Sequence, residues 1–132
     1  MKLKNITKYI VSALFLISID LIWLLLIIKS KMDFWLIDLM REKSIVWSAL
    51  FAWLLIPLGI VFLIDRTSKS IKESAIYGAL YGFCLYGVYE FTNYAIIKTW
   101  SLSMLFVDII WGTVLCSIAA IFLRYVSKKW LE

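Results

Sequence analysis

Histidine is absent from this 132-residue chain, which also has only two cysteines and one proline. Without histidine, zinc and transition-metal sites lack one of their commonest ligands. Cys84 and Cys116 both lie inside apolar runs and form no CxxC pair, which is typical of small apolar helix residues. The sequence therefore predicts no metal site and no cofactor.

Charged residues are also scarce, at 17% of the chain against about 25% in an average soluble domain. Apolar residues reach 64%, whereas soluble domains contain about 45–50%. This excess needs lipid to cover it, and four spans of about 20 residues would use most of the length. The net charge is +5, and the lysines and arginines that produce it lie in short segments between apolar runs. This position is typical of residues that set membrane orientation and argues against nucleic acid as a partner.

Four apolar runs predict an all-α membrane protein, a four-transmembrane-helix bundle that forms one domain over residues 1–132. The predicted spans cover residues 9–28, 45–64, 74–97 and 102–125. The first run is too long for a signal peptide, contains Asp20 and has no small-residue cleavage site after it. The segment KMDFWLIDLMREKS between the first two spans predicts a short interfacial helix.

Lysine and arginine are distributed unevenly between the two sides of the predicted bundle. The side that carries both termini has Lys2, Lys4, Lys8, Arg66, Lys69, Lys72, Arg124, Lys128 and Lys129, and the other side has Lys29, Lys31, Arg41, Lys43 and Lys98. The positive-inside rule therefore predicts that both termini are cytoplasmic.

Small residues mark one face of the third predicted span. Gly78 and Gly82 form a small-xxx-small pattern, which lets two helices approach closely. At 100° per residue, one stripe of the helix carries Ala75, Gly78, Gly82, Tyr86, Tyr89 and Asn93. We expect this stripe to face protein, and we expect Gly112 in the last span to serve helix packing as well.

Three carboxyl groups lie inside predicted spans, those of Asp20, Glu90 and Asp108. Each costs about 2.5–3.5 kcal/mol near a helix centre, and such residues usually mark a pathway, a relay or a ligand site. Counted at about 1.5 Å per residue from the span ends, all three lie roughly 10–13 Å below the outer surface. Because the three acids lie at one level on three different helices, we predict that they form a common acidic layer that faces the bundle interior.

No lysine, arginine or histidine lies at that level to neutralise the acids. At least one of them should then hold a proton, unless an external cation is bound. Asn93, Tyr86 and Tyr89 can supply hydrogen bonds, and Trp23 and Trp111 offer aromatic faces that suit organic cations. Protonated acids that only join helices through hydrogen bonds are the alternative.

The last two spans read YGVYEFTNYAIIKTWSLSMLFVDIIWGTVL, and this segment closely resembles an uncharacterised family of small bacterial membrane proteins, domain of unknown function 2177. The matching residues are Tyr86, Gly87, Tyr89, Glu90, Thr92, Asn93, Val107, Asp108, Trp111, Gly112 and Thr113, with Asp20, Trp23 and Leu24 in the first span. The family usually has Asp where Glu90 stands, and Gly and Pro near Thr99 and Ser101. The resemblance implies a four-helix fold in the bacterial inner membrane and no settled activity.

Three functions remain open on the sequence. The acidic layer favours binding or transport of a proton, a cation or an amphiphile. The second is an enzyme of lipid modification, or an accessory to one, although no nucleophile–base pair is evident. The third is an assembly subunit in which the acids are polar helix contacts. The lipid bilayer is the expected partner in each case, and a homo-oligomer is compatible with all three.

Overall fold

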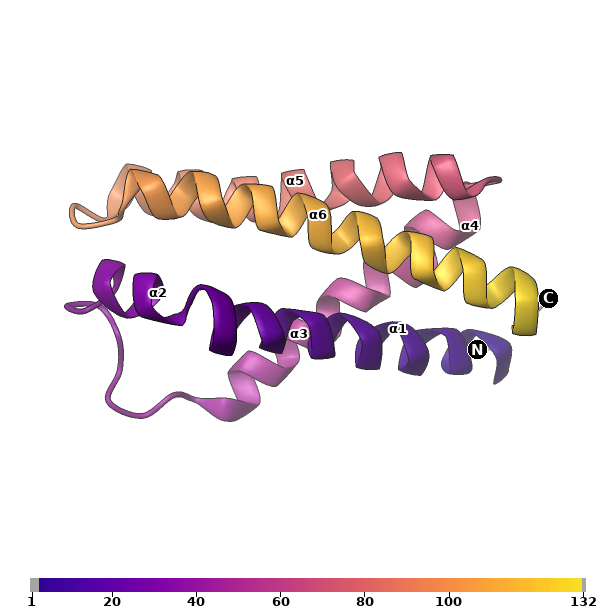
Figure 1. The fold of residues 1–132 in the computed structure, drawn as a ribbon, viewed down its shortest axis with the longest axis horizontal. Helices are drawn as coiled ribbons and strands as arrows, with labels where there is room; N and C mark the ends of the chain where they lie inside the picture. Colours follow the sequence, from indigo (N-terminus) through magenta and orange to yellow (C-terminus); the bar gives the residue numbers. More distant parts are fainter. Residues whose placement is uncertain (1–2, 132) are drawn as a thin grey trace.

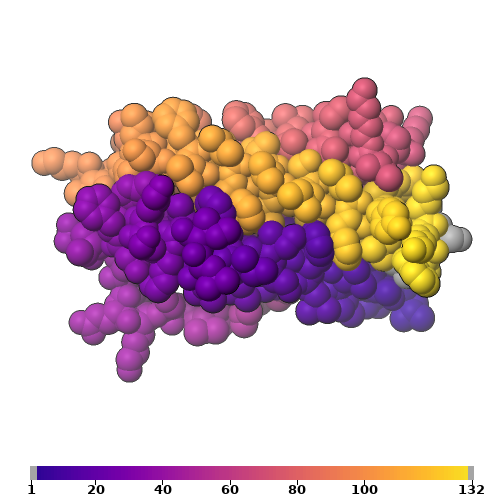
Figure 2. Space-filling model, viewed as in Figure 1, coloured from indigo at the N-terminus to yellow at the C-terminus, as the bar shows by residue number. Residues whose placement is uncertain are grey.

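The computed structural model describes residues 3–131, and every regular element in that range is helical. Figure 1 shows the first helix and the last two long helices running along one long axis, with residues 46–67 crossing them obliquely, and Figure 2 gives the space-filling view of the same face. In chain order they are α1 (Leu3–Ile22), η1 (Trp23–Ile27), α2 (Lys29–Trp35), α3 (Val46–Gly59), η2 (Ile60–Ile64), α4 (Asp65–Thr67), α5 (Ile71–Ile96), α6 (Leu102–Val126) and η3 (Ser127–Leu131), where η denotes a π-helical segment.

Three continuous helical segments are long and apolar enough to cross a membrane: residues 3–27, 46–67 and 102–130. The 26-residue helix α5 is long enough but is not among them. It carries five of the seven tyrosines, three of the five glycines and the buried Glu90, all of which lower its hydropathy. Helix length and composition therefore support three of the four predicted spans, and the fourth depends on how α5 packs.

The loops differ in part from those expected. The short helix between the first two spans is α2, which begins earlier than predicted and ends at Trp35. A turn at residues 36–39 and open chain up to Ile45 follow it. The predicted turn before the last span is present, with the Trp100 amide bonded to the Ile97 carbonyl at 3.1 Å.

Side-chain caps begin the last two long helices. The Ser70 hydroxyl accepts the Glu73 amide at 3.1 Å, and the Glu73 carboxylate accepts the Lys69 amide at 2.6 Å. Ser101 accepts the Met104 amide at 3.2 Å in the same manner. These bonds satisfy amides that have no partner within a helix, so both helix starts are fixed locally.

Pro57 lies inside α3, one turn before the π-helical segment η2. Proline cannot donate its amide, so the Trp53 carbonyl one turn earlier loses its usual helix donor and the helix is weakened here. The Tyr9 hydroxyl donates to the Leu54 carbonyl at 2.8 Å, and the Tyr81 hydroxyl donates to the Ile56 carbonyl at 3.4 Å. Tyrosines of α1 and α5 thus support the interrupted helix.

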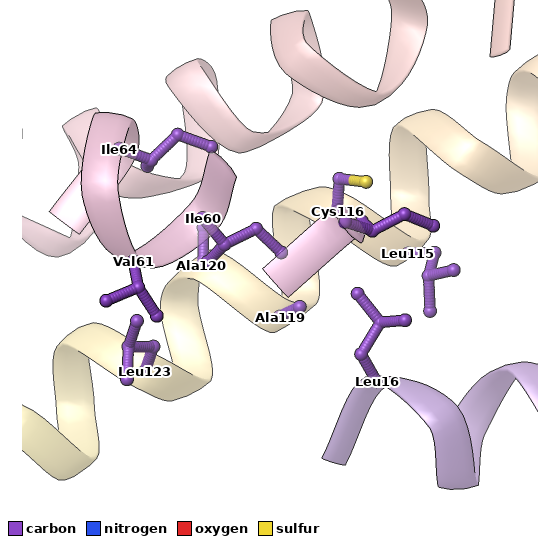
Figure 3. Close-up of a cluster of buried hydrophobic side chains, with 10 residues drawn as sticks. Leu16, Ile60, Val61, Ile64, Leu115, Cys116, Ala119, Ala120 and Leu123 are labelled. Carbon is purple, nitrogen blue, oxygen red and sulfur yellow. The ribbon is translucent and has the colours of Figure 1, made fainter. Parts of the chain in front are cut away.

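The apolar core fills the half of the bundle near the chain termini, where α1, η2 and α6 meet (Figure 3). Its fully buried side chains include Leu16, Ile60, Leu115 and Leu123. The exterior is also apolar: Leu63, Val88 and Ile110 are each at least 60% exposed. Helices that are apolar on both the inner and the outer face fit a lipid surrounding.

An ion pair ties the bundle together at the same end. The Lys8 ammonium lies 2.7 Å from the Asp65 carboxylate, and the Arg124 guanidinium lies 3.9 Å from its other oxygen. The three residues come from α1, α4 and α6, and Lys8 and Asp65 are almost fully buried. Sequence analysis treated Lys8 and Arg124 as orientation charges alone. The structure gives them a packing role as well.

Candidate functional site: a carboxyl cavity beside a tryptophan clamp

Asp20 of α1 is 5% exposed and faces the interior of the bundle. Its two carboxylate oxygens accept separate hydrogen bonds, one from the Trp53 indole of α3 and one from the Trp111 indole of α6, both at 2.8 Å. These bonds link three helices through one carboxylate. We call Asp20, Trp53 and Trp111 the tryptophan clamp.

Trp23 extends the clamp on one side. Its ring is stacked on that of Trp111, with a centroid distance of 4.3 Å and an interplanar angle of 6°. One face of each ring is therefore covered by the other ring. The sequence predicts that the faces of both rings suit an organic cation; in this arrangement the Trp111 edge contacts a carboxylate, and one face of Trp23 contacts Trp111.

Glu90 of α5 is 1% exposed and accepts the Trp100 indole N–H at 2.7 Å. Trp100 lies in the turn before α6 and contacts the Tyr89 ring edge-on, at 5.9 Å between centroids. The bond joins the end of α5 to the turn that follows it. Here too the donor to a buried acid is an indole.

Asp108 of α6 differs from the other two acids. Its carboxyl lies within hydrogen-bonding reach of Glu90 and interacts electrostatically with Asp20. Two carboxylates only accept hydrogen bonds, so a bond between Glu90 and Asp108 requires one proton. Among the hydrogen bonds found in residues 3–131, none brings an N–H or hydroxyl donor to Asp108, so one side of its carboxyl is available to a ligand.

That side faces a cavity of about 300 Å³ between α3, α5 and α6. Its walls are formed by Ala52, Leu55, Ile56, Tyr81, Leu85, Tyr86, Tyr89 and Asp108. Among the described residues of these walls, Asp108 is the one with an ionisable carboxyl group. The volume is at the lower end of that of small-molecule sites, which combine apolar walls with a few polar groups in this way.

The predicted site residues fall into two groups. Tyr86, Tyr89 and Asp108 line the cavity, with Glu90 buried behind them. Asp20, Trp23 and Trp111 form the neighbouring clamp. Asn93 is half-buried and lies within hydrogen-bonding reach of the Tyr89 hydroxyl.

Sequence analysis missed Trp53, Trp100 and Tyr81 as members of this region. Trp53 lies deep within an apolar span, where an indole N–H needs an acceptor, and this was the available signal. Trp100 stands at a span end, where interfacial anchoring is a sufficient explanation. Nothing in the sequence singles out Tyr81 among five tyrosines on one helix.

Glycines bring α5 and α6 into backbone contact. A Cβ atom on Gly82 would overlap the backbone carbonyl of Gly112, and one on Gly78 would lie 2.6 Å from the Cys116 carbonyl oxygen. Gly112 accommodates the ring of Tyr86. The close packing holds Tyr86 and Asp108, on facing helices, against the same cavity.

We expect Asp20→Asn to destabilise the protein. An Asp→Asn exchange at a protonated carboxyl group would instead keep a hydrogen-bond donor in place and cost little. The asparagine amide would present an N–H group to one of the two indole donors, leaving a buried donor without an acceptor. Such a loss costs about 1–3 kcal/mol, so the thermal unfolding midpoint in detergent should fall by several degrees. The exposed Asp38→Asn is the matched control, and equal midpoints for the two variants would contradict the clamp.

These features define an all-helical protein with the apolar surface of an integral membrane protein. The chain belongs to the family of predicted membrane proteins DUF2177, whose family model matches residues 5–124. The resemblance noted on the sequence is thereby confirmed. No curated protein and no solved structure shows significant similarity to the chain.

Proposed function

We propose that this protein binds a monovalent organic cation in the cavity at Asp108 and releases a proton when it does so. The observation that carries the proposal is the position of Asp108, which is the one carboxyl group among the described wall residues of an otherwise apolar and aromatic cavity and lies within reach of the buried Glu90. A proton shared by two carboxyl groups is readily exchanged for a cation, because both can then ionise. The three tyrosine rings of the walls suit an organic cation better than a hydrated metal ion.

The proposal includes a membrane arrangement with four spans and both termini in the cytoplasm. If the segments at 46–67 and 102–130 both cross the membrane, the chain must return between them, and α5 is the element that connects their opposite ends (Figure 1). Its buried Glu90 carboxyl and two of its three glycines, Gly78 and Gly82, face α6, which reduces the cost of its polarity. The exposed Phe34 suits α2 to the membrane interface.

The experiment is a binding titration with a hydrophobic primary amine. The full chain is reconstituted in phosphatidylcholine nanodiscs and titrated with hexylamine, and tryptophan fluorescence reports binding. We expect saturable binding by the native chain and none by Asp108→Asn at the same concentrations. Equal binding by both proteins would contradict the proposal.

A structural role is the second candidate, and it applies to the other two acids. Asp20 and Glu90 both accept indole hydrogen bonds that join separate segments, as polar helix contacts would. In this account Asp20 is structural, and Glu90 both accepts the indole bond and shares the exchanged proton with Asp108. Asp20→Asn should then lower stability while hexylamine binding to the folded fraction is retained.

Topology can be tested with reporters. A green fluorescent protein fused after Glu132, which lies outside the described residues, should fluoresce, and alkaline phosphatase at the same position should be inactive. The same phosphatase inserted after Met40, in the open segment before α3, should be active. An active phosphatase at the C-terminus would overturn the orientation.

A further inference from the structure

A second hollow lies beside the Asp108 cavity, toward the half of the bundle that carries the chain termini. It measures about 410 Å³ and is lined by residues of η2, α4 and α5, among them Leu63, Tyr77 and Leu80. The two hollows have Tyr81 in common, and both lie between the second helical segment and α5. Because they share a residue and the same two walls, we treat them as one groove, which we call the α5 groove.

From these two hollows we infer that the cation bound at Asp108 is the head of a single-chain amphiphile whose hydrocarbon chain lies in the α5 groove. The inference rests on the proposed function and adds the class of ligand, a long-chain amine. Charge complementarity supports this occupant, because the carboxyl group lies at one end of the groove and no described lining residue is a lysine or arginine.

The length of the groove fits one extended hydrocarbon chain. Tyr89 and Tyr77 mark its two ends on α5, and twelve residues at about 1.5 Å each correspond to roughly 18 Å. Asp108 itself lies roughly 10–13 Å below the outer surface of a hydrocarbon region about 30 Å thick. A chain anchored there would therefore cross the midplane and reach Leu80 and Tyr77 toward the cytoplasmic side.

Tyr81 lies at the middle of the groove, where two contacts hold it against α3. Its hydroxyl donates to the Ile56 carbonyl at 3.4 Å, and its ring lies directly against Gly59, where a Cβ atom would overlap it. The absent side chain of Gly59 lets the ring lie close to α3. In our inference the hydrocarbon chain passes over the side of the ring that faces away from α3.

The test compares a short and a long amine, hexylamine and tetradecylamine, on the full chain in phosphatidylcholine nanodiscs. Leu80→Trp fills the distal part of the groove, and we expect it to weaken tetradecylamine binding by about tenfold or more while hexylamine affinity changes less than about twofold. Leu63→Trp approaches the same space from η2 and should do likewise. Val88→Trp, at a 71% exposed position of α5 outside both hollows, is the matched control and should change neither affinity.

The outcomes separate this inference from the proposed function. If both groove variants bind the two amines as the native chain does, the chain does not lie in the groove and the inference is overturned, although the head-group site stands. An equal loss for both amines would also overturn it. Native mass spectrometry of the reconstituted protein supplies a second test, because a retained diacyl phospholipid that tetradecylamine does not displace would exclude a single-chain occupant. Unchanged binding in Asp108→Asn would instead sink the proposed function.

Discussion

Gly82→Ile is expected to lower the thermal unfolding midpoint more than any other single substitution in α5. A Cβ at this position would overlap the Gly112 carbonyl, which is backbone and has no rotamer with which to move away. The two helices must therefore separate along their most extensive contact. Overpacking a well-packed core costs about 1–3 kcal/mol, and a backbone collision should cost at least the upper value.

Gly87→Ile is the matched control on the same helix. A Cβ on Gly87 meets nothing within 4 Å, so the side chain extends without displacing a neighbour. Gly87→Ala should even stabilise α5, because glycine costs up to about 1 kcal/mol relative to alanine inside a helix. Unfolding of the Gly82 and Gly87 variants is followed by size-exclusion chromatography after heating in detergent. Equal midpoints for Gly82→Ile and Gly87→Ile would contradict the close approach of α5 and α6.

Asp108→Asn is expected to abolish amine binding and its pH dependence while the fold is retained. The asparagine has the shape of the acid, and its amide can donate to Glu90 in place of the shared proton, so the unfolding midpoint should stay the same or rise. Loss of the counter-ion for a largely desolvated ammonium costs about 2–5 kcal/mol, which corresponds to at least roughly 30-fold in affinity.

The sign of the pH dependence follows from competition between the proton and the cation. In the proposed exchange each bound amine releases one proton from the protein, so the amine affinity of the native chain should increase with pH while the amine itself remains charged. Binding to Asp108→Asn should be weak at every pH. The exposed Asp33→Asn should behave as the native chain, and a native affinity that falls with rising pH over this range would contradict proton exchange.

Much of this arrangement followed from periodicity and depth. Counting residues from the span ends put Asp20, Glu90 and Asp108 at one level, and the structure buries the first two and brings Asp108 within reach of Glu90. The glycine stripe of α5 likewise predicted a contact face. These inferences need only the geometry of one helix and the avoidance of lipid by carboxyl groups.

The partners of the acids could not be predicted in the same way. Whether Trp53 or Asn93 reaches a carboxylate depends on the rotation of three helices about their axes, which no single helix specifies. The π-helical segments η1 and η2 change that rotation locally and leave no pattern in the sequence. The Lys8–Asp65 ion pair could not be predicted either, because charged residues at span ends usually remain in water or at lipid head groups.

Infrared difference spectroscopy of the carboxyl groups tests proton exchange at Asp108 most directly. Spectra of the native chain in nanodiscs at neutral pH are recorded before and after hexylamine is added. We predict a protonated carboxyl band without the amine, its loss when the amine binds, and no amine-dependent change in Asp108→Asn. A native spectrum with all carboxyl groups ionised before the amine is added, or a band that the amine leaves unchanged, would contradict the account.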